Sequence, residues 1–351
     1  MPPPRRRSWL RVVVISLGVL GVIVLLHQMT LMRLMSTSPS LRHDAVPGEH
    51  ARPADLVDDR KPADSNDDWR RAMQHRPAAA PTPVVVHYTS RTRHPMVEQW
   101  KDTCGPLEVR FYDDDASEEL VRKHRPEFLE TYRTALTPVE RADYFRYLVL
   151  YVHGGVYADS DVSCLTPVGQ WLSTFGWDDY ELSDMDFVAG IEFPWAQSQY
   201  RVTGPLPLQF NQFLIASTKQ SRMMERILKH IEHCIRTVPR NHLEATLERT
   251  GPAAFTRAIL DEIQRRGIPD PSAAKHPGAS DYPPAMLPPD ELDKNGQVIP
   301  MRADADADGE TPFFKVLLLP YRAFAFHRAH NHAAGPVLTE HHFKGSWRIE
   351  T

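Results

Sequence analysis

Residues 151–167 read YVHGGVYADSDVSCLTP, and this stretch is the most informative in the chain. Tyr147–Val152 has the apolar pattern of a strand, and a short apolar step, Val156–Ala158, follows the next turn. Asp159 and Asp161 come immediately afterwards. Two carboxylates at i and i+2 on a strand project to the same side, so the sequence predicts paired acids at a strand end.

The chemistry of these residues favours a metal site that holds a phosphorylated ligand. Carboxylate oxygens suit Mg²⁺ or Mn²⁺, which keep part of their hydration and share their coordination with substrate phosphates. Gly154 and Gly155 would let the backbone approach a bulky ligand. An Asp-x-Asp pair is also common in solvated surface turns, which is the competing interpretation.

Strand and helix patterns alternate along the rest of the chain. Strands are predicted at Val84–Val86, Leu107–Tyr112, Phe187–Ile191 and Val316–Leu319. Helices are predicted at Ser117–His124, Glu127–Ala135, Pro138–Tyr151, Ser221–Thr237, Asn241–Thr250 and Ala253–Arg266, the third overlapping the strand pattern above. The alternation predicts an α/β domain whose largely parallel sheet is covered by helices. The Pro- and Asp-rich residues Gly267–Pro312 are expected to form a long surface excursion.

The N-terminal residues have the pattern of a membrane anchor. A basic tail, 1–11, precedes an apolar run that starts at Val12 and extends to Met32. A full span needs about 20 apolar residues, and basic residues before it predict a cytosolic N-terminus with a lumenal remainder. A cleaved signal peptide is the alternative. Residues 36–82 are predicted to be a disordered stem, and 83–351 the folded domain.

Charge and cysteine content limit other possibilities. The formal net charge of −4 gives no reason to expect a nucleic-acid partner. Three cysteines, Cys104, Cys164 and Cys234, allow at most one disulfide, and their pairing stays open. Asp304–Gly309 resembles the start of an EF-hand, but Lys315 stands at the twelfth position, which argues against a calcium loop.

Two further groups could complete a ligand site. Asp143 and Arg146 lie three apart and share one face of a predicted helix, where they could grip sugar hydroxyls and a diphosphate. An ordinary surface ion pair is the alternative. The tail Glu340–Trp347 offers a histidine pair for a metal, and Lys344 and Ser346 for diphosphate oxygens. A zinc site with His327, His330 and His332 is conceivable, but no cysteine stands at the required spacing.

Taken together, these segments resemble one family. The chain is similar to the retaining glycosyltransferases with an Asp-x-Asp sugar-binding region, typified by the fungal initiating α-1,6-mannosyltransferases. The similar segments are Val84–His87, Arg141–Pro167, Gly190–Glu192, Gln209–Phe213, Thr250–Pro252 with Phe255-Thr256, and His341–Trp347. The resemblance covers roughly residues 83–351, and Asn211 and Phe213 depart from the commonest residues of their segment.

The resemblance implies a GT-A fold, a Rossmann-like nucleotide-sugar-binding sheet flanked by helices, in a single catalytic domain. It implies a type II Golgi membrane protein that transfers mannose from GDP-mannose with retention, using Mn²⁺ or Mg²⁺, in protein N-linked glycosylation. Alternatives are mannosylation of inositol-phosphate sphingolipid and a UDP-sugar-dependent hexosyltransferase. A rival from another class is an Asp-x-Asp phosphatase of the haloacid dehalogenase type. The Gly-Gly that precedes the acidic pair and the terminal motif of this chain do not fit it. A non-catalytic sugar-binding Golgi protein would bind donor without turnover.

The resemblance also implies roles for single residues. Asp161 would bind the metal, Asp159 the metal or the ribose, and His342 would be the third metal ligand. Asp143, Arg146 and Tyr157 would belong to the donor site, and His87 would lie near the nucleotide. Glu192 and Gln212 would face the other side of the sugar, and the donor-binding group would be completed by Lys344, Ser346 and Trp347.

Overall fold

The computed structural model describes residues 84–193, 208–240, 245–269, 283–287, 292, 296–303, 313–326 and 336–342. The predicted tail (1–11), anchor (12–32) and stem (36–82) lie outside the described residues. So do residues 304–309, and the side chains Lys344, Ser346, Trp347, His327, His330 and His332. Among the described helices, none has the length and apolar character needed to cross a membrane.

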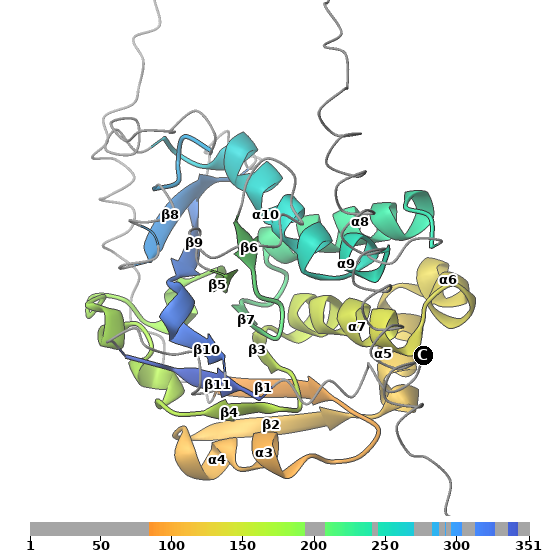
Figure 1. The fold of residues 1–351 in the computed structure, drawn as a ribbon, viewed down its shortest axis with the longest axis horizontal. Coiled ribbons are helices and arrows are strands. Elements are labelled where there is room, and N and C mark those ends of the chain that lie inside the picture. The colour runs from red at the N-terminus through yellow and green to blue at the C-terminus, as the bar shows by residue number, and fades with distance from the viewer. Residues whose placement is uncertain are drawn as a thin grey trace, which may run out of the picture. The chain divides into compact units, whose positions relative to one another are not determined.

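Eight strands form a central mixed sheet in the order β2-β1-β3-β7-β5-β9-β8, with β6 paired to β5 (Figure 1). β1 is parallel to β2 and β3, and β5 is parallel to β9, whereas β6, β7 and β8 are antiparallel to their neighbours. The strands are β1 Val84–Thr89, β2 Leu107–Tyr112, β3 Gly155–Ala158, β5 Phe187–Phe193, β6 Gln209–Phe210, β7 Leu214–Ser217, β8 Gln297–Arg302 and β9 Phe313–Leu319.

The α/β class is confirmed, but the expectation of a largely parallel sheet was wrong. Parallel neighbours need a crossover of a dozen or more residues. Residues 303–312, between β8 and β9, are too few for one, so these strands pair antiparallel. The prediction of a surface excursion over Gly267–Pro312 was therefore wrong for β8, where Gln297, Ile299 and Met301 are buried. Pro300 is tolerated because β8 is an edge strand.

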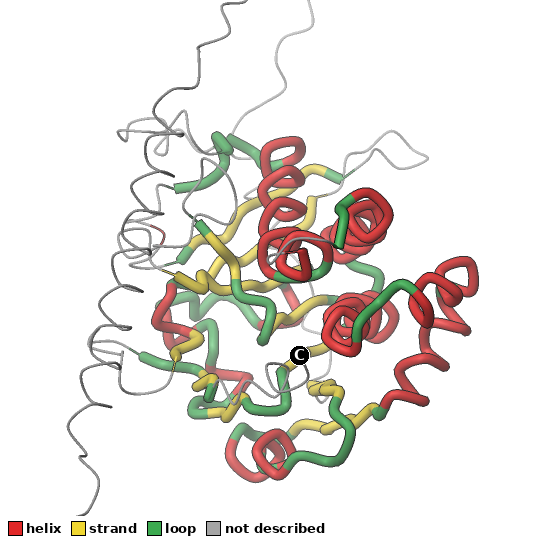
Figure 2. Tube along the Cα trace, turned by 45° about the vertical axis from the view of Figure 1, so that its right-hand side comes forward, coloured by secondary structure: helices red, strands yellow, loops and turns green. Residues whose placement is uncertain are grey.

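Helices α7, α8 and α10 cover one face of the sheet (Figures 1 and 2), whereas α3 and α4 contribute to the core on the other face. The helices are α3 Pro95–Glu98, α4 Trp100–Thr103, α5 Asp114–His124, α6 Leu129–Thr134, α7 Pro138–His153, α8 Arg222–Thr237, α9 Ala245–Arg249 and α10 Pro252–Arg266. Short 3₁₀ turns occupy Pro126–Phe128, Val168–Gln170, Ser173–Phe175, Leu182–Asp184 and Tyr321–Ala323. The predicted helices are found with small shifts of their ends, whereas α3, α4 and most of the 3₁₀ turns were not predicted.

Tyr147–Val152 belongs to α7, so its interpretation as a strand was wrong. Thr137 and Glu140 form a capping box, and Pro138 occupies the first turn, which starts a helix that continues to His153. The residues from Tyr147 to Leu150 are all buried, and a helix buried on most sides loses the polar stripe that marks amphipathic helices.

The glycine pair after α7 allows close contact with neighbouring backbone segments. Gly154 and Gly155 have φ of +69° and +95°, the left-handed region that favours glycine. A Cβ on Gly154 would lie 2.6 Å from the backbone nitrogen of Lys219, and one on Gly155 would collide with the carbonyl oxygen of Val85. The expected approach of a ligand is therefore not what requires these glycines.

A second, three-stranded sheet packs on the other face, in the order β10-β11-β4. Its strands are β10 Phe324–Phe326, β11 Thr339–His341 and β4 Val162–Cys164; β11 is parallel to β10 and antiparallel to β4. Trp100 and Trp171 fill the core on this side. Cys104 and Cys164 form a disulfide with 6.2 Å between their Cα atoms, and Cys234 is buried and free.

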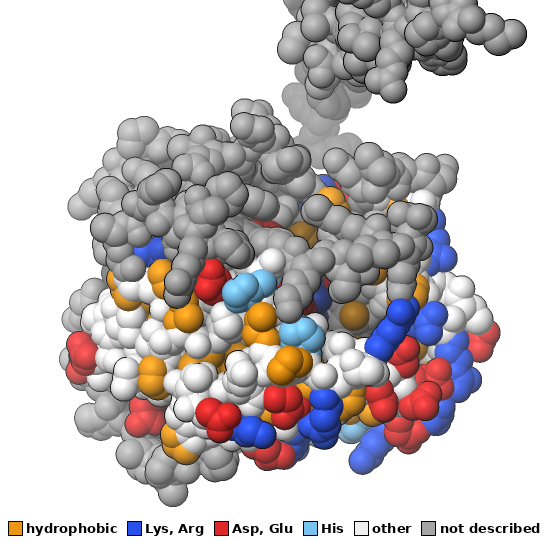
Figure 3. All heavy atoms as spheres, turned by 60° about the horizontal axis from the view of Figure 1, so that its bottom comes forward, with side chains coloured by type: hydrophobic (Ala, Val, Ile, Leu, Met, Phe, Trp, Pro, Cys, Tyr) orange, Lys and Arg blue, Asp and Glu red, His pale blue; other side chains and the backbone are white. Residues whose placement is uncertain are grey.

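Figure 3 brings forward the side of the molecule that carries α3, α4 and β2. On this view Lys and Arg side chains alternate with Asp and Glu. Arg110 pairs with Glu108, and Arg122 with Glu118. On the face shown, charged side chains of the described residues thus pair with neighbours of opposite sign.

Candidate active site

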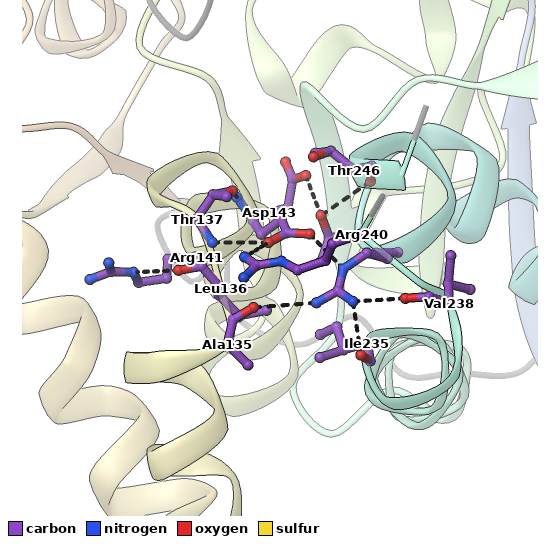
Figure 4. A network of polar contacts seen from close by, with 12 residues as sticks. Ala135, Leu136, Thr137, Arg141, Asp143, Ile235, Val238, Arg240 and Thr246 are labelled. Carbon is purple, nitrogen blue, oxygen red and sulfur yellow. Dashed lines mark hydrogen bonds and ion pairs between the residues drawn. The ribbon is translucent and has the colours of Figure 1, made fainter. Parts of the chain in front are cut away.

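The site is built on α7, whose N-terminus is fixed by a buried ionic network (Figure 4). Glu140 accepts hydrogen bonds from Arg249 at 2.7 Å and Arg240 at 2.8 Å. Arg249 also donates to the carbonyl oxygens of Ile235 and Val238. Burial raises the pKa of Glu140, but the bonds from Thr137 and the two arginines outweigh it and leave the pKa lowered. The network stays ionised, so it holds one end of α7 against α8 and α9.

One turn further along α7, Asp143 and Arg146 form a buried ion pair. Arg146 donates to Asp143 Oδ1 at 2.6 Å and to Asp159 Oδ1 at 3.0 Å. Both side chains of the α7 pair are about 95% buried, so the alternative of a surface ion pair does not apply. Burial opposes the charge on Arg146, yet the carboxylates of Asp159 and Asp143 raise its pKa well above the ordinary value. Arg146 therefore links the helix to the Asp-x-Asp motif.

Asp143 lies at the centre of a polar network that sequence reasoning found only in part. Thr250 donates to Asp143 Oδ2 at 2.7 Å, and Gln212 donates to Oδ1 at 3.2 Å. The hydroxyl of Tyr147 lies within hydrogen-bond distance of Gln212 and of the Thr250 carbonyl. Burial raises the pKa of Asp143 to about 6, against the opposing charge of Arg146. Thr250 belongs to the Thr-Gly-Pro segment noted in the sequence, whereas nothing local distinguished Tyr147.

Tyr157, on β3, orients Asp159. Its hydroxyl donates to Asp159 Oδ1 at 2.9 Å, and the guanidinium of Arg146 lies 5.2 Å from the centre of its ring. Burial and the neighbouring Asp159 carboxylate raise the pKa of Tyr157 well above its ordinary value. The hydroxyl therefore stays protonated and remains a donor. One oxygen of Asp159 is thus committed to Arg146 and Tyr157.

Asp159, Asp161 and His341 form a group that could hold a metal ion, with ligand atoms that all lie within 4.8 Å of one another. His341 Nε2 is 3.1 Å from Asp161 Oδ1. Two carboxylates and an imidazole suit Mn²⁺ or Mg²⁺ with open positions for water and substrate oxygens. These residues fit the metal that the sequence led us to expect.

The neighbouring His342 lies differently from the expectation. Its backbone nitrogen donates to the carbonyl oxygen of Asp161 at 3.0 Å, and its Nε2 lies 2.9 Å from the hydroxyl of Ser163. His341, not His342, presents a ring nitrogen to the acidic pair, and its ring stacks on Phe213 with 4.3 Å between centroids. β11 pairs with β4, and His341 stands opposite Val162, next to Asp161.

A second polar group lies around the end of β5 and the start of β6. Gln209 donates a hydrogen bond to the half-buried Glu192. Burial raises the pKa of Glu192 to about 7, although the bond from Gln209 and the charges of His341 and Arg146 oppose it. A carboxyl with such a pKa exists in both protonation states near neutral pH.

Asn211, between β6 and β7, has a buried side chain whose unusual environment the sequence did not reveal. Its side chain is fully buried, yet within the described structure neither amide atom has a hydrogen-bond partner. Its Nδ2 lies over Gly190, where a Cβ would stand only 2.7 Å away. A buried amide that lacks both an acceptor and a donor partner is costly, and it favours a bound group that can supply both.

His87 lies in the core and is fully buried. Its Nε2 is 3.0 Å from the carbonyl oxygen of Gly154, and its Nδ1 is 3.2 Å from the hydroxyl of Tyr112. The carbonyl can only accept, so Nε2 carries the proton and Nδ1 accepts from Tyr112. Burial lowers the pKa of His87 to about 3, and the ring is neutral at physiological pH. Both ring nitrogens are thus engaged within the protein.

Comparison with known proteins identifies the region that holds part of this site. Residues 90–176 match the family described as "Glycosyltransferase sugar-binding region containing DXD motif". An initiation-specific alpha-1,6-mannosyltransferase of Schizosaccharomyces pombe is 24% identical over 266 residues, covering 71% of this chain and 58% of that protein. The Candida albicans protein of the same name is 27% identical over 180 residues, covering 47% and 46%.

The name of a third relative contains a lipid. Mannosyl phosphorylinositol ceramide synthase CSH1 of Saccharomyces cerevisiae is 34% identical over 89 residues, which is 23% of each chain. The chain thus spans less than two thirds of the length of each of these relatives. Among solved structures, the PaToxG glycosyltransferase has a TM-score of 0.35 and 16% identity, covering 52% of this chain and 70% of that chain, a likeness too weak to support an inference.

The matched region contains Asp143, Arg146, Asp159 and Asp161. In the structure, Arg146 bonds both Asp143 and Asp159. Residues 90–176 of this chain are therefore similar to the glycosyltransferase sugar-binding region that contains a DXD motif.

Proposed function

We propose that this chain is a metal-dependent glycosyltransferase that transfers mannose from GDP-mannose to a glycan acceptor with retention, in protein N-linked glycosylation. The observation that carries the proposal is the grouping of Asp159, Asp161 and His341 beside the buried Asp143–Arg146 pair. Residues that match a sugar-binding region and relatives named as mannosyltransferases support it. The catalytic domain, residues 83–351, would be of the GT-A type.

The acidic pair and one histidine would hold Mn²⁺ or Mg²⁺. The chemistry that such an ion supplies is neutralisation of the charge on the leaving diphosphate. Asp161 would bind through a carboxylate oxygen and His341 through a ring nitrogen. Asp159 would bind through the oxygen that Arg146 and Tyr157 do not contact. His341 would take the place that the resemblance assigned to His342, because its ring nitrogen lies next to Asp161.

Donor binding would fall to the residues around Asp143. Carboxylate and amide groups of Asp143, Gln212 and Asn211 can bond sugar hydroxyls, which both donate and accept. Glu192, with a pKa of about 7, would lie on the other side of the sugar and could hold or release a proton near neutral pH. Lys344, Ser346 and Trp347 would complete the diphosphate and donor contacts. His87 would support the site from the core rather than touch the nucleotide.

The compartment follows from the proposed anchor and from the disulfide. Disulfides persist in oxidising compartments, so the bond between Cys104 and Cys164 supports a lumenal catalytic domain. We propose a type II protein of the Golgi membrane, anchored by residues 12–32 with the stem 36–82 between anchor and domain.

A donor screen tests the activity. Purified domain with Mn²⁺ is offered GDP-mannose, UDP-glucose, UDP-galactose and UDP-GlcNAc, and sugar release is measured with and without EDTA. We expect turnover of GDP-mannose that EDTA abolishes. Preference for a UDP-sugar would overturn the donor assignment, and donor binding with no turnover of any donor would indicate a sugar-binding protein.

The alternative acceptor is an inositol-phosphate sphingolipid, which the similarity to the ceramide synthase of Saccharomyces cerevisiae favours. Acceptor assays with an N-glycan and with inositol-phosphoceramide, each with GDP-mannose, separate the two. Transfer to the glycan with no transfer to the lipid is the expected result. The reverse pattern would replace the proposed acceptor and leave the donor site unchanged.

A further inference from the structure

The three residues of the proposed metal group stand on two different sheets. Asp159 directly follows β3 of the central sheet, and its backbone nitrogen donates to the carbonyl oxygen of Phe213 at 2.8 Å. Asp161 directly precedes β4, and His341 is the last residue of β11, both in the three-stranded sheet. Because Ser160 alone separates Asp159 from Asp161, the position of His341 and the direction of the Asp161 side chain are what depend on how the small sheet is held.

The small sheet needs support from the rest of the fold. β4 and β11 have three residues each, and a sheet of three such strands is marginal in isolation. Asp161 directly precedes β4, and its carbonyl oxygen and side chain contact His342 and His341 on the β11 side. An additional attachment of β4 is needed to fix Asp161 against the central sheet.

Residues 95–104 supply that attachment at both ends of β4. The indole Nε1 of Trp100 donates to the carbonyl oxygen of Val162 at 3.0 Å. One turn later Cys104 is bonded through its sulfur to Cys164. Trp100 is fully buried, and Cys104 leads directly into β2 of the central sheet. The first and last residues of β4 are thus tied to the edge of the main sheet.

We propose that the indole of Trp100 and the Cys104–Cys164 disulfide are positioning groups for the metal site, an inference that rests on the proposed function. They hold β4 so that Asp161 and His341 meet Asp159 at ligand distance. They contact neither substrate nor ion. Loss of either attachment leaves the central sheet in place and lets Asp161 and His341 move away from Asp159. Groups outside the ligand shell that orient metal ligands typically change metal affinity by 10- to 100-fold.

Two variants remove the attachments separately. Trp100→Phe keeps an aromatic ring in the core and deletes only the indole donor, and Cys104→Ala/Cys164→Ala deletes the disulfide without leaving a thiol. Trp171→Phe is the matched control, because Trp171 also loses one buried indole bond in the same core, to Thr166 rather than to β4. Cys234→Ser controls for the loss of a buried cysteine.

The Kd of Mn²⁺ is measured by electron paramagnetic resonance in the presence of GDP, at a temperature where circular dichroism shows every variant folded. We expect the Kd to rise about tenfold for the double cysteine variant and severalfold for Trp100→Phe. The two controls should stay within about twofold of the wild type. Folded attachment variants with wild-type Kd would overturn the proposal.

A readout independent of metal separates this inference from the proposed function. Diethyl pyrocarbonate modification of His341 is followed by peptide mass spectrometry, since a buried imidazole reacts slowly and a released one faster. If the wild type binds no Mn²⁺, the proposed metal site fails. Faster modification of His341 in the attachment variants would still support the positioning role, and unchanged modification would refute it.

Discussion

His341 and Asp161 lie 3.1 Å apart through Nε2 and Oδ1, although 180 residues separate them in the chain. The contact exists because β11 pairs antiparallel with β4 and sets His341 opposite Val162. A residue from the end of the described chain thereby completes a site that begins in the Asp-x-Asp motif. The first two predictions concern this pair.

Replacing Asp161 by Asn should abolish sugar transfer and leave the fold intact. The amide keeps the shape of the carboxylate and removes the charge that would bind Mn²⁺. Because loss of outer partners alone costs 10- to 100-fold, loss of a direct ligand should lower kcat/KM by more than about a hundredfold. Initial rates with GDP-mannose and Mn²⁺ measure this, with the exposed Asp115→Asn as the control. Near-normal turnover by folded Asp161→Asn would remove Asp161 from the metal site.

The two adjacent histidines should differ in their effect on metal affinity. His341→Gln removes the ring nitrogen beside Asp161, whereas His342→Gln removes a ring that faces Ser163. We expect the Mn²⁺ Kd to rise by about 10- to 100-fold for His341→Gln and by less than about threefold for His342→Gln. Titration of Mn²⁺ against each variant gives both values. The opposite order would favour the ligand that the resemblance implied.

The sequence was sufficient for much of this site, and the reasons are local. Asp143 and Arg146 share a helix face by spacing alone, and Asp159 and Asp161 stand two apart. The pairing of β4 with β11 has no local signal, so the choice between His341 and His342 could not be made from spacing. Asn211 was also hidden, since its significance depends on burial and absent partners within the described structure.

The lowered pKa of His87 leads us to expect that the free energy of unfolding depends on pH. Its pKa is about 3 in the folded protein and about 6.5 when unfolded. Below pH 6.5 the unfolded chain gains a proton that the folded one does not, so stability is fully present above pH 6.5 and is lost as the pH falls toward 3. At pH 5 this single group should cost about 2 kcal/mol relative to pH 7.5.

Urea unfolding of the wild type and His87→Leu at pH 7.5 and pH 5 isolates that contribution. The variant loses the bonds to Gly154 and Tyr112 and should be less stable at both pH values. From pH 7.5 to pH 5, the free energy of unfolding of the variant should fall by about 2 kcal/mol less than that of the wild type. The exposed His233→Gln is the control and should keep the wild-type decline. An equal decline in His87→Leu would contradict a neutral buried ring.

Replacing Asn211 by Leu should stabilise the protein without ligand and weaken its hold on the donor. Leucine has a similar size and leaves no buried amide unpartnered, so the free energy of unfolding should rise by about 1 kcal/mol. If the amide bonds a sugar hydroxyl, KM for GDP-mannose should rise about tenfold, and deoxymannose donors that lack the bonded hydroxyl should no longer be disfavoured. Urea unfolding and donor kinetics measure the two effects, and Asn211→Asp, which keeps one acceptor, should lie between them in KM. A destabilised Asn211→Leu with unchanged discrimination would instead indicate that an ordered water satisfies the amide.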